Sequence, residues 1–111
     1  MEKYLGEFLG TMVLIVFGNG LGASLNLNKA IAKNFAPSWF TAVFAWGLAV
    51  TLGVYTAGFY NSGGHLNPSV TIAFAIGGSF PWDQVFGYII PQVAGAFVGA
   101  AIITVMYHTH F

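Results

Sequence analysis

The sequence predicts an all-α transmembrane fold built from three spanning helices and one re-entrant half-helix. The scarcity of charge is the first observation behind this prediction, since charged residues make up only 5% of the 111 residues, against roughly 25% in a soluble domain. Three long uncharged stretches are the second, and they cover residues 8–28, 34–82 and 84–111. Each stretch is long enough to cross a bilayer, because a spanning helix needs about 20 apolar residues.

The composition excludes several classes of function. The chain holds three lysines, no arginine and no cysteine. Proteins bind nucleic-acid phosphates through clusters of cationic side chains. Three lysines are too few for such a cluster, so no nucleic-acid partner is expected. The lack of cysteine excludes thiolate chemistry and cysteine metal sites. His108 and His110 stand two residues apart and do not share a helix face. With no third ligand in view, we expect neither a metal site nor a cofactor.

The first spanning helix is expected from about residue 4 to about residue 25. A signal peptide would carry basic residues near its start, whereas this chain carries the acidic Glu2 and Glu7 there. We therefore expect a membrane-spanning helix and not a cleaved signal peptide. Small residues spaced four apart let membrane helices pack closely. Two glycine pairs have that spacing: Gly6 with Gly10, and Gly18 with Gly22.

Two more spanning helices are expected, from about 39 to about 60 and from about 82 to about 108. A polar loop over 26–38 separates the first two spans. Aromatic residues near both ends of the second span suit the two membrane interfaces. Pro91 lies inside the third span and predicts a kink there, because proline cannot donate the helical hydrogen bond.

The segment between these two spans, over about 61–78, predicts a re-entrant loop followed by a half-helix. A polar break rich in glycine precedes the apolar run 70–76. Apolar runs this short are typical of re-entrant or buried segments, and about 10 helical residues rise roughly 15 Å, half of a bilayer. Asn67 suits the N-cap of the half-helix and Pro68 its first position, with the small Ser69 beside them.

The polar break is the expected functional site, because non-helical backbone is tolerated at membrane depth only where it is buried in protein or lines a water-filled cavity. The half-helix N-terminus carries about half a positive charge, and the neutral Asn67 amide can both donate and accept hydrogen bonds. Backbone carbonyls along one side of the path are expected from Gly63, Gly64, His65 and Leu66. Such a site suits water or a small neutral polyol. It holds no acid–base pair and no nucleophile with a base, so no enzyme is expected.

Four motifs resemble the aquaporin and glycerol-facilitator family, and they come in the family's order. The family's first signature loop is similar to Ser62-Gly63-Gly64-His65-Leu66-Asn67-Pro68-Ser69-Val70-Thr71. Its first three helices are similar, in turn, to Glu7-Phe8-Leu9-Gly10-Thr11, Ala45-Trp46-Gly47-Leu48 and Gln92-Val93-Ala94-Gly95-Ala96. The resemblance covers essentially the whole chain and implies one inverted-repeat half of an aquaporin-like fold.

The resemblance implies a channel for glycerol, other small neutral polyols and water. It implies that Asn67 lies at the mid-pore constriction and that the carbonyls of residues 63–66 line one half of the path. Trp46 matches the aromatic part of the outer selectivity filter, and tryptophan there is similar to the glycerol-conducting branch. Gly47 and Val50 would lie on the same wall of the pore as Trp46. Glu7 resembles a buried glutamate that braces irregular loop backbone.

The chain departs from the family most strongly in its length. Ser69 and Gly64 replace two alanines of the usual loop, and both are small. The chain resembles the first of two inverted halves, without the second Asn-Pro loop or the filter arginine, so we expect that it does not conduct alone. We expect either a fragment of a longer protein, or a truncated gene product, or half of a pore completed by another chain, for example by an antiparallel copy. The resemblance further implies the cell membrane and a homo-oligomer, a tetramer of complete pores.

Two other functions remain open. A small proton-coupled exporter would use Glu7 as its proton carrier. Such a protein needs an acid near mid-membrane and four full spans, whereas Glu7 lies near the start of its helix and the fourth segment is too short to span. A non-conducting assembly subunit is favoured by the glycine pairs and by the missing half. Thr11 and Gln92 are expected to form hydrogen bonds between helices rather than to contact a substrate.

Overall fold

The computed structural model describes residues 1–27 and 38–110, and that part of the chain contains helices and no strand. The three long helices are α1 (Glu2–Asn26), α2 (Trp39–Gly58) and α4 (Val85–Met106). The shorter elements are α3 (Pro68–Ile76) and two 3-10 turns, η2 (Trp82–Gln84) and η3 (His108–His110). This arrangement confirms the predicted all-α fold. The polar loop expected over 26–38 lies largely outside the described residues.

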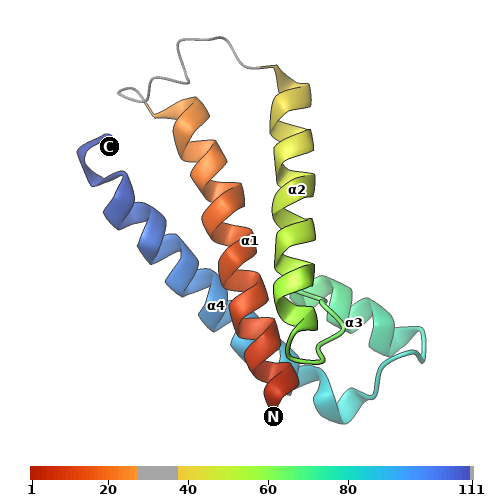
Figure 1. Cartoon of the computed structure of the whole chain (residues 1–111). Coiled ribbons are helices and arrows are strands. Elements are labelled where there is room, and N and C mark those ends of the chain that lie inside the picture. Colours follow the sequence, from red (N-terminus) through yellow and green to blue (C-terminus); the bar gives the residue numbers. More distant parts are fainter. Residues whose placement is uncertain (28–37, 111) are drawn as a thin grey trace.

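Helix α1 is the central element of the bundle. It lies between α2 and α4 and packs against both (Figure 1). α1 and α4 both start at the end of the bundle that holds the N-terminus, whereas α2 runs back toward that end. The short α3 lies at the same end of the bundle and contacts α4. The described part of the chain measures 47 by 27 by 22 Å.

Glycines let α1 approach both neighbouring helices at the level of the backbone. A Cβ built on Gly10 would lie 2.8 Å from the carbonyl oxygen of Gly53 on α2. On the other side, a Cβ on Gly95 of α4 would clash with the carbonyl oxygen of Phe8. These crossings therefore leave no room for a side chain, which is the close packing that small residues allow in membrane helices. Gly22 is different, since a Cβ there would meet nothing within 4 Å.

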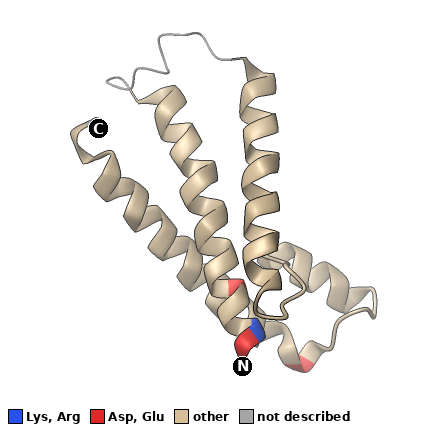
Figure 2. Ribbon diagram, viewed as in Figure 1, with Lys and Arg blue, Asp and Glu red and all other residues tan. Residues whose placement is uncertain are grey.

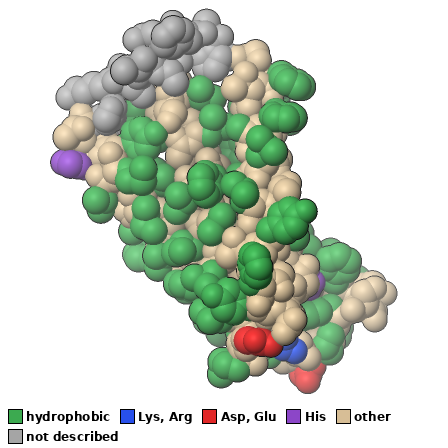
Figure 3. All heavy atoms as spheres, viewed as in Figure 1, with side chains coloured by type: hydrophobic (Ala, Val, Ile, Leu, Met, Phe, Trp, Pro, Cys, Tyr) green, Lys and Arg blue, Asp and Glu red, His purple; other side chains and the backbone are tan. Residues whose placement is uncertain are grey.

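The outer surface of the bundle is apolar. Figure 3 shows hydrophobic side chains over the long helices, with the described charges gathered at the N-terminal end. Phe86, Ile90, Val93 and Phe97 form one exposed stripe on α4. α1, α2, and α4 together with η2 are each long and apolar enough to cross a membrane. Apolar surface of this extent is covered by lipid or by protein in a functional molecule.

The substitution Gly95→Ala should lower the stability of the bundle. The added methyl group would overlap the Phe8 carbonyl, and forcing extra atoms into a packed contact costs about 1–3 kcal/mol of unfolding free energy. Thermal unfolding in detergent micelles measures the change, with Gly22→Ala as the matched control. Equal melting temperatures for the two variants would contradict the close contact between α1 and α4.

Candidate functional site

The loop between α2 and α3 is held by one buried carboxylate, that of Glu7 on α1. This side chain is fully buried and accepts hydrogen bonds from the backbone N–H groups of His65 (3.2 Å) and Leu66 (2.9 Å). The Ser62 hydroxyl and the Gln92 side-chain amide (2.6 Å) donate to it as well. Figure 2 shows that the described charges lie near this end of the bundle. Because four donors converge on this one buried side chain, Glu7 is a firm anchor for the loop.

The loop backbone is strained where Glu7 holds it. Leu66 has a φ of +54°, which residues with large side chains rarely adopt. Such a conformation costs about 1–3 kcal/mol and persists only where the surroundings over-determine it. For Leu66, the surroundings are the hydrogen bond to Glu7 and a buried side chain between Gly10 and Gly53. The side chain of Leu66 therefore points into the protein and anchors the loop.

A second layer of hydrogen bonds connects the loop to α3 and α4. The Gln92 amide that donates to Glu7 also donates to the Thr71 hydroxyl at 3.0 Å. Thr71 is fully buried, and its hydroxyl lies 3.0 Å from Nδ1 of His65. It also donates to the carbonyl oxygen of Asn67 at 3.4 Å. One polar network thus fixes α1, the loop, α3 and α4 relative to one another.

The His65 ring packs among aromatic rings rather than standing free. Its centroid lies 5.0 Å from that of Phe74, 4.8 Å from Phe80 and 4.9 Å from Tyr88. Edge and tilted arrangements at these distances are favourable for aromatic pairs. The cluster joins the loop to α3, to α4 and to the segment between them. The His65 ring is therefore half-buried and held by this cluster.

Helix α3 begins with an exposed asparagine cap. Asn67 is the N-cap, its Oδ1 accepts a hydrogen bond from the Ser69 N–H at 2.8 Å, and Pro68 follows at the first helical position. The Asn67 side chain is exposed, and its Nδ2 donates to no residue among 1–27 and 38–110. Nine residues rise about 14 Å, roughly half of a bilayer core. The cap therefore presents a neutral, unpaired amide donor at the positive end of a half-length helix.

One exposed face of α2 leads away from this cap. Val54 lies next to Gly64 of the loop, while Val50 and Gly47 are exposed further along the same face. The half-buried Trp46 lies about two turns from Val54, or roughly 12 Å along the axis. Trp46 and Asn67 are thus not brought into one cluster. They lie at different heights along the axis of α2, and the exposed face of α2 and the α2–α3 loop connect them.

Two expectations about polar residues can be compared with these contacts. Gln92 bonds across helices to Glu7 and Thr71. The Thr11 hydroxyl, in contrast, is buried without a hydrogen-bond partner in the described part of the chain, so Thr11 fills space between helices there. Thr71 was not singled out from the sequence. Its position four residues after the Asn67 cap was the available signal, because residues four apart lie on one helix face.

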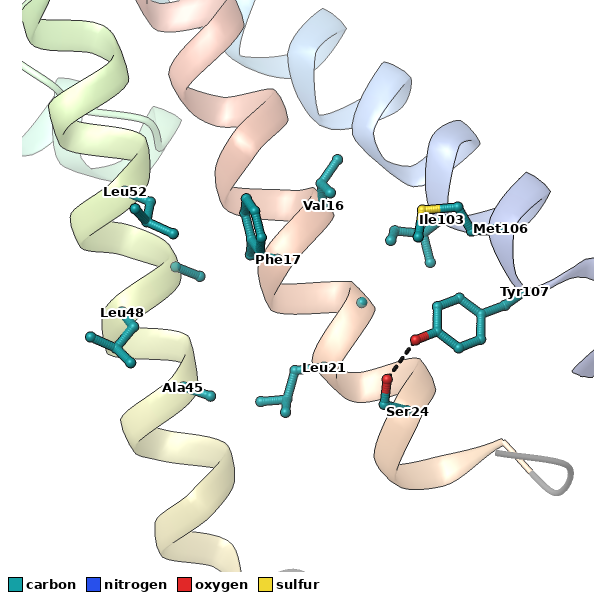
Figure 4. A pocket seen from close by; sticks show the side chains of 12 residues that line it. Val16, Phe17, Leu21, Ser24, Ala45, Leu48, Leu52, Ile103, Met106 and Tyr107 are labelled. Carbon is teal, nitrogen blue, oxygen red and sulfur yellow. Dashed lines mark hydrogen bonds between the residues drawn. The ribbon is translucent and has the colours of Figure 1, made fainter. Parts of the chain in front are cut away.

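A groove between the other ends of α1, α2 and α4 is separate from this site. Its volume is about 430 Å³, and its lining is apolar apart from Ser24 and Tyr107. These two hydroxyls lie 2.5 Å apart and share a hydrogen bond (Figure 4). Figure 4 shows Leu48 and Leu52 of α2 facing the groove from one side and Ile103 of α4 from the other. The groove offers no charged group to a ligand.

These features define an integral membrane protein in which a helical bundle holds a re-entrant loop and half-helix. The chain belongs to the Major intrinsic protein family, a family of membrane channels, whose profile matches residues 1–110.

Curated relatives in this family are similar along the whole chain. Over 111 residues, the chain is 52% identical to glycerol uptake facilitator protein 2 of Lactiplantibacillus plantarum and covers 46% of that protein. It is 47% identical to the probable glycerol uptake facilitator protein of Thermotoga maritima, of which it also covers 46%. It is 46% identical to the glycerol uptake facilitator protein of Bacillus subtilis, of which it covers 39%. The chain therefore spans less than half the length of these relatives.

The substitution Glu7→Gln should loosen the α2–α3 loop. The N–H groups of His65 and Leu66 bond different oxygens of Glu7, so glutamine keeps an acceptor for one of them and turns its NH2 group toward the other. A buried donor left without its acceptor costs about 1–3 kcal/mol, so amide hydrogen exchange should become about tenfold faster at one or both of these residues. Exchange measured by mass spectrometry in nanodiscs checks this.

The matched control is Glu2→Gln. Glu2 lies on the same helix, is exposed, and accepts a hydrogen bond from Asn61, which a glutamine oxygen can still accept. Exchange at His65 and Leu66 that is as slow in Glu7→Gln as in this control would show that the carboxylate does not hold the loop.

Proposed function

We propose that this chain forms one half of the wall of a passive channel for glycerol, other small neutral polyols and water in the cell membrane. The observation that supports this most strongly is the exposed Asn67 amide at the start of a half-length helix, next to a loop held by a buried carboxylate. The relatives named as glycerol uptake facilitators point to the same substrates. The pore needs a second half, from a further segment or another chain, and complete pores would form a homo-oligomer such as a tetramer.

The proposed path follows the exposed face of α2 and then the loop. Trp46 would form the aromatic side of the outer filter, with Gly47 and Val50 on the wall beyond it. The carbonyls of residues 63–66 and the amide of Asn67 would then replace the hydrogen bonds that a hydroxyl group loses on leaving water. The positive end of α3 would repel protons and other cations. A neutral solute that carries hydroxyl groups fits this lining best.

We propose transport without catalysis and without a proton carrier. Within the described residues, Glu7 is the buried acid at the loop. Four donors from the loop and α4 occupy its carboxylate. A group held in this way serves as a brace for the loop, whereas a general acid or an exporter's carrier has to exchange protons with water.

Flux measurements on proteoliposomes test the proposal. The sample is the membrane protein that contains this chain together with its second half, as it occurs in the native membrane. In stopped-flow light scattering, glycerol and water should each move down their own gradient at rates that a proton gradient does not change. Glycerol accumulation driven by protons would indicate an exporter, and absence of flux a non-conducting subunit. Either result would overturn the proposal.

The substitution Asn67→Asp should lower glycerol flux while keeping the fold. Aspartate caps a helix as well as asparagine, and its oxygen can accept the Ser69 N–H in the same way. The change therefore replaces only the amide donor, and puts a negative charge in its place. An unmatched polar contact costs about 1–3 kcal/mol, so flux should fall about tenfold. Asn26→Asp, at the exposed end of α1, is the control. Equal flux in the two variants would remove Asn67 from the path.

The substitution Trp46→Phe should lower the ratio of glycerol to water permeability. The smaller ring offers less apolar surface to the carbon edge of a polyol, while water does not depend on that surface. Both permeabilities are measured on the same vesicles, and Trp39→Phe is the control, because Trp39 is 83% exposed on the same helix. A ratio that Trp46→Phe leaves unchanged would exclude this ring from the filter.

A further inference from the structure

The ring of Trp46 lies against α1 at a position where α1 has no side chain. Gly18 is buried, and a Cβ built on it would overlap three ring atoms of Trp46, Cζ3, Cη2 and Cε3, the farthest of them at 2.5 Å. The indole is rigid and moves as one body about two torsions, so it cannot yield locally as the end of a flexible chain would. Any side chain at position 18 and the present placement of the Trp46 ring therefore exclude each other.

This contact is specific to Gly18. On the same face of α1, eight residues or about 12 Å earlier, Gly10 receives the side chain of Leu66. Gly22, one turn after Gly18, would meet nothing within 4 Å if it carried a Cβ. Gly10 and Gly18 of α1 thus each receive a large side chain from the α2 side of the bundle: Leu66 of the loop, and Trp46 of α2.

We propose that Gly18 is a positioning residue for the selectivity of the channel. Because Gly18 has no side chain, the Trp46 ring can pack directly against the backbone of α1. How closely the ring packs there sets the width of the solute path beside it. The inference rests on the proposed function, because it concerns the role of Trp46 in the filter. Gly47 and Val50 are exposed on the neighbouring side of α2, so a Trp46 ring displaced from α1 toward that side would narrow the passage. A narrower passage hinders glycerol more than water, because glycerol is the larger solute.

The test compares Gly18→Ala with Gly22→Ala in the complete channel in proteoliposomes. Gly18→Ala should lower the ratio of glycerol to water permeability about tenfold, since one methyl group in a close-fitting site is worth about 10- to 200-fold in discrimination. Gly22→Ala should leave the ratio unchanged. A ratio that is unchanged or raised in Gly18→Ala, in a parent channel that conducts both solutes, overturns the inference and leaves the proposed function intact. A parent channel that conducts neither solute overturns both.

A second background separates positioning from a general loss of stability. Phenylalanine lacks the fused ring whose atoms face Gly18, so adding Gly18→Ala to Trp46→Phe should leave the ratio of Trp46→Phe unchanged within about twofold. A strong effect in the tryptophan background that is lost in the phenylalanine background is the coupling expected of two residues in contact. A similar fall in both backgrounds overturns the inference. If the single variant Gly18→Ala does not fold, the double variant with Trp46→Phe tests the inference instead. Failure of the double variant to fold would overturn the inference as well.

Discussion

Backbone N–H groups outside a helix need hydrogen-bond partners wherever protein and lipid replace water around them. In this chain, the loop between α2 and α3 has that need, and the Glu7 carboxylate meets it for His65 and Leu66. The same carboxylate binds Gln92 of α4, which in turn binds Thr71 of α3. A single buried acid therefore fixes the loop to three helices. The position of the Asn67 cap follows from this network, since Asn67 lies between the braced residues and Thr71.

Helix α1 contributes no side chain to the proposed path, yet it determines where the path residues lie. Glu7 and Gly10 hold the loop, one by hydrogen bonds and the other by receiving Leu66. Gly18 receives Trp46 two turns further along. The spacing of these contacts on one rigid helix sets the distance between the proposed filter and the proposed constriction. Substitutions on α1 are therefore expected to alter permeation without touching the solute.

The sequence was sufficient for those features that depend on local composition. Long uncharged runs predict the spans, and the short apolar run after Asn67 and Pro68 predicts the half-helix, because hydropathy and capping act over a few residues. Contacts between elements were harder to predict. Helical spacing shows that Gly10 and Gly18 share a face of α1, but not that they receive Leu66 and Trp46. The part of Thr71 in the network was also hidden, because it depends on where α4 places Gln92.

The most direct test of this account asks whether the capped end of α3 borders a water-filled path. The chain has no cysteine, so Ser69→Cys introduces a single thiol beside the cap, and Val93→Cys places one on the exposed stripe of α4. In a channel that is otherwise free of cysteine, a water-soluble thiol reagent should modify Ser69→Cys and lower glycerol flux. Added glycerol should slow the modification of Ser69→Cys, and Val93→Cys should not react with the reagent. Ser69→Cys as unreactive as Val93→Cys would contradict the account.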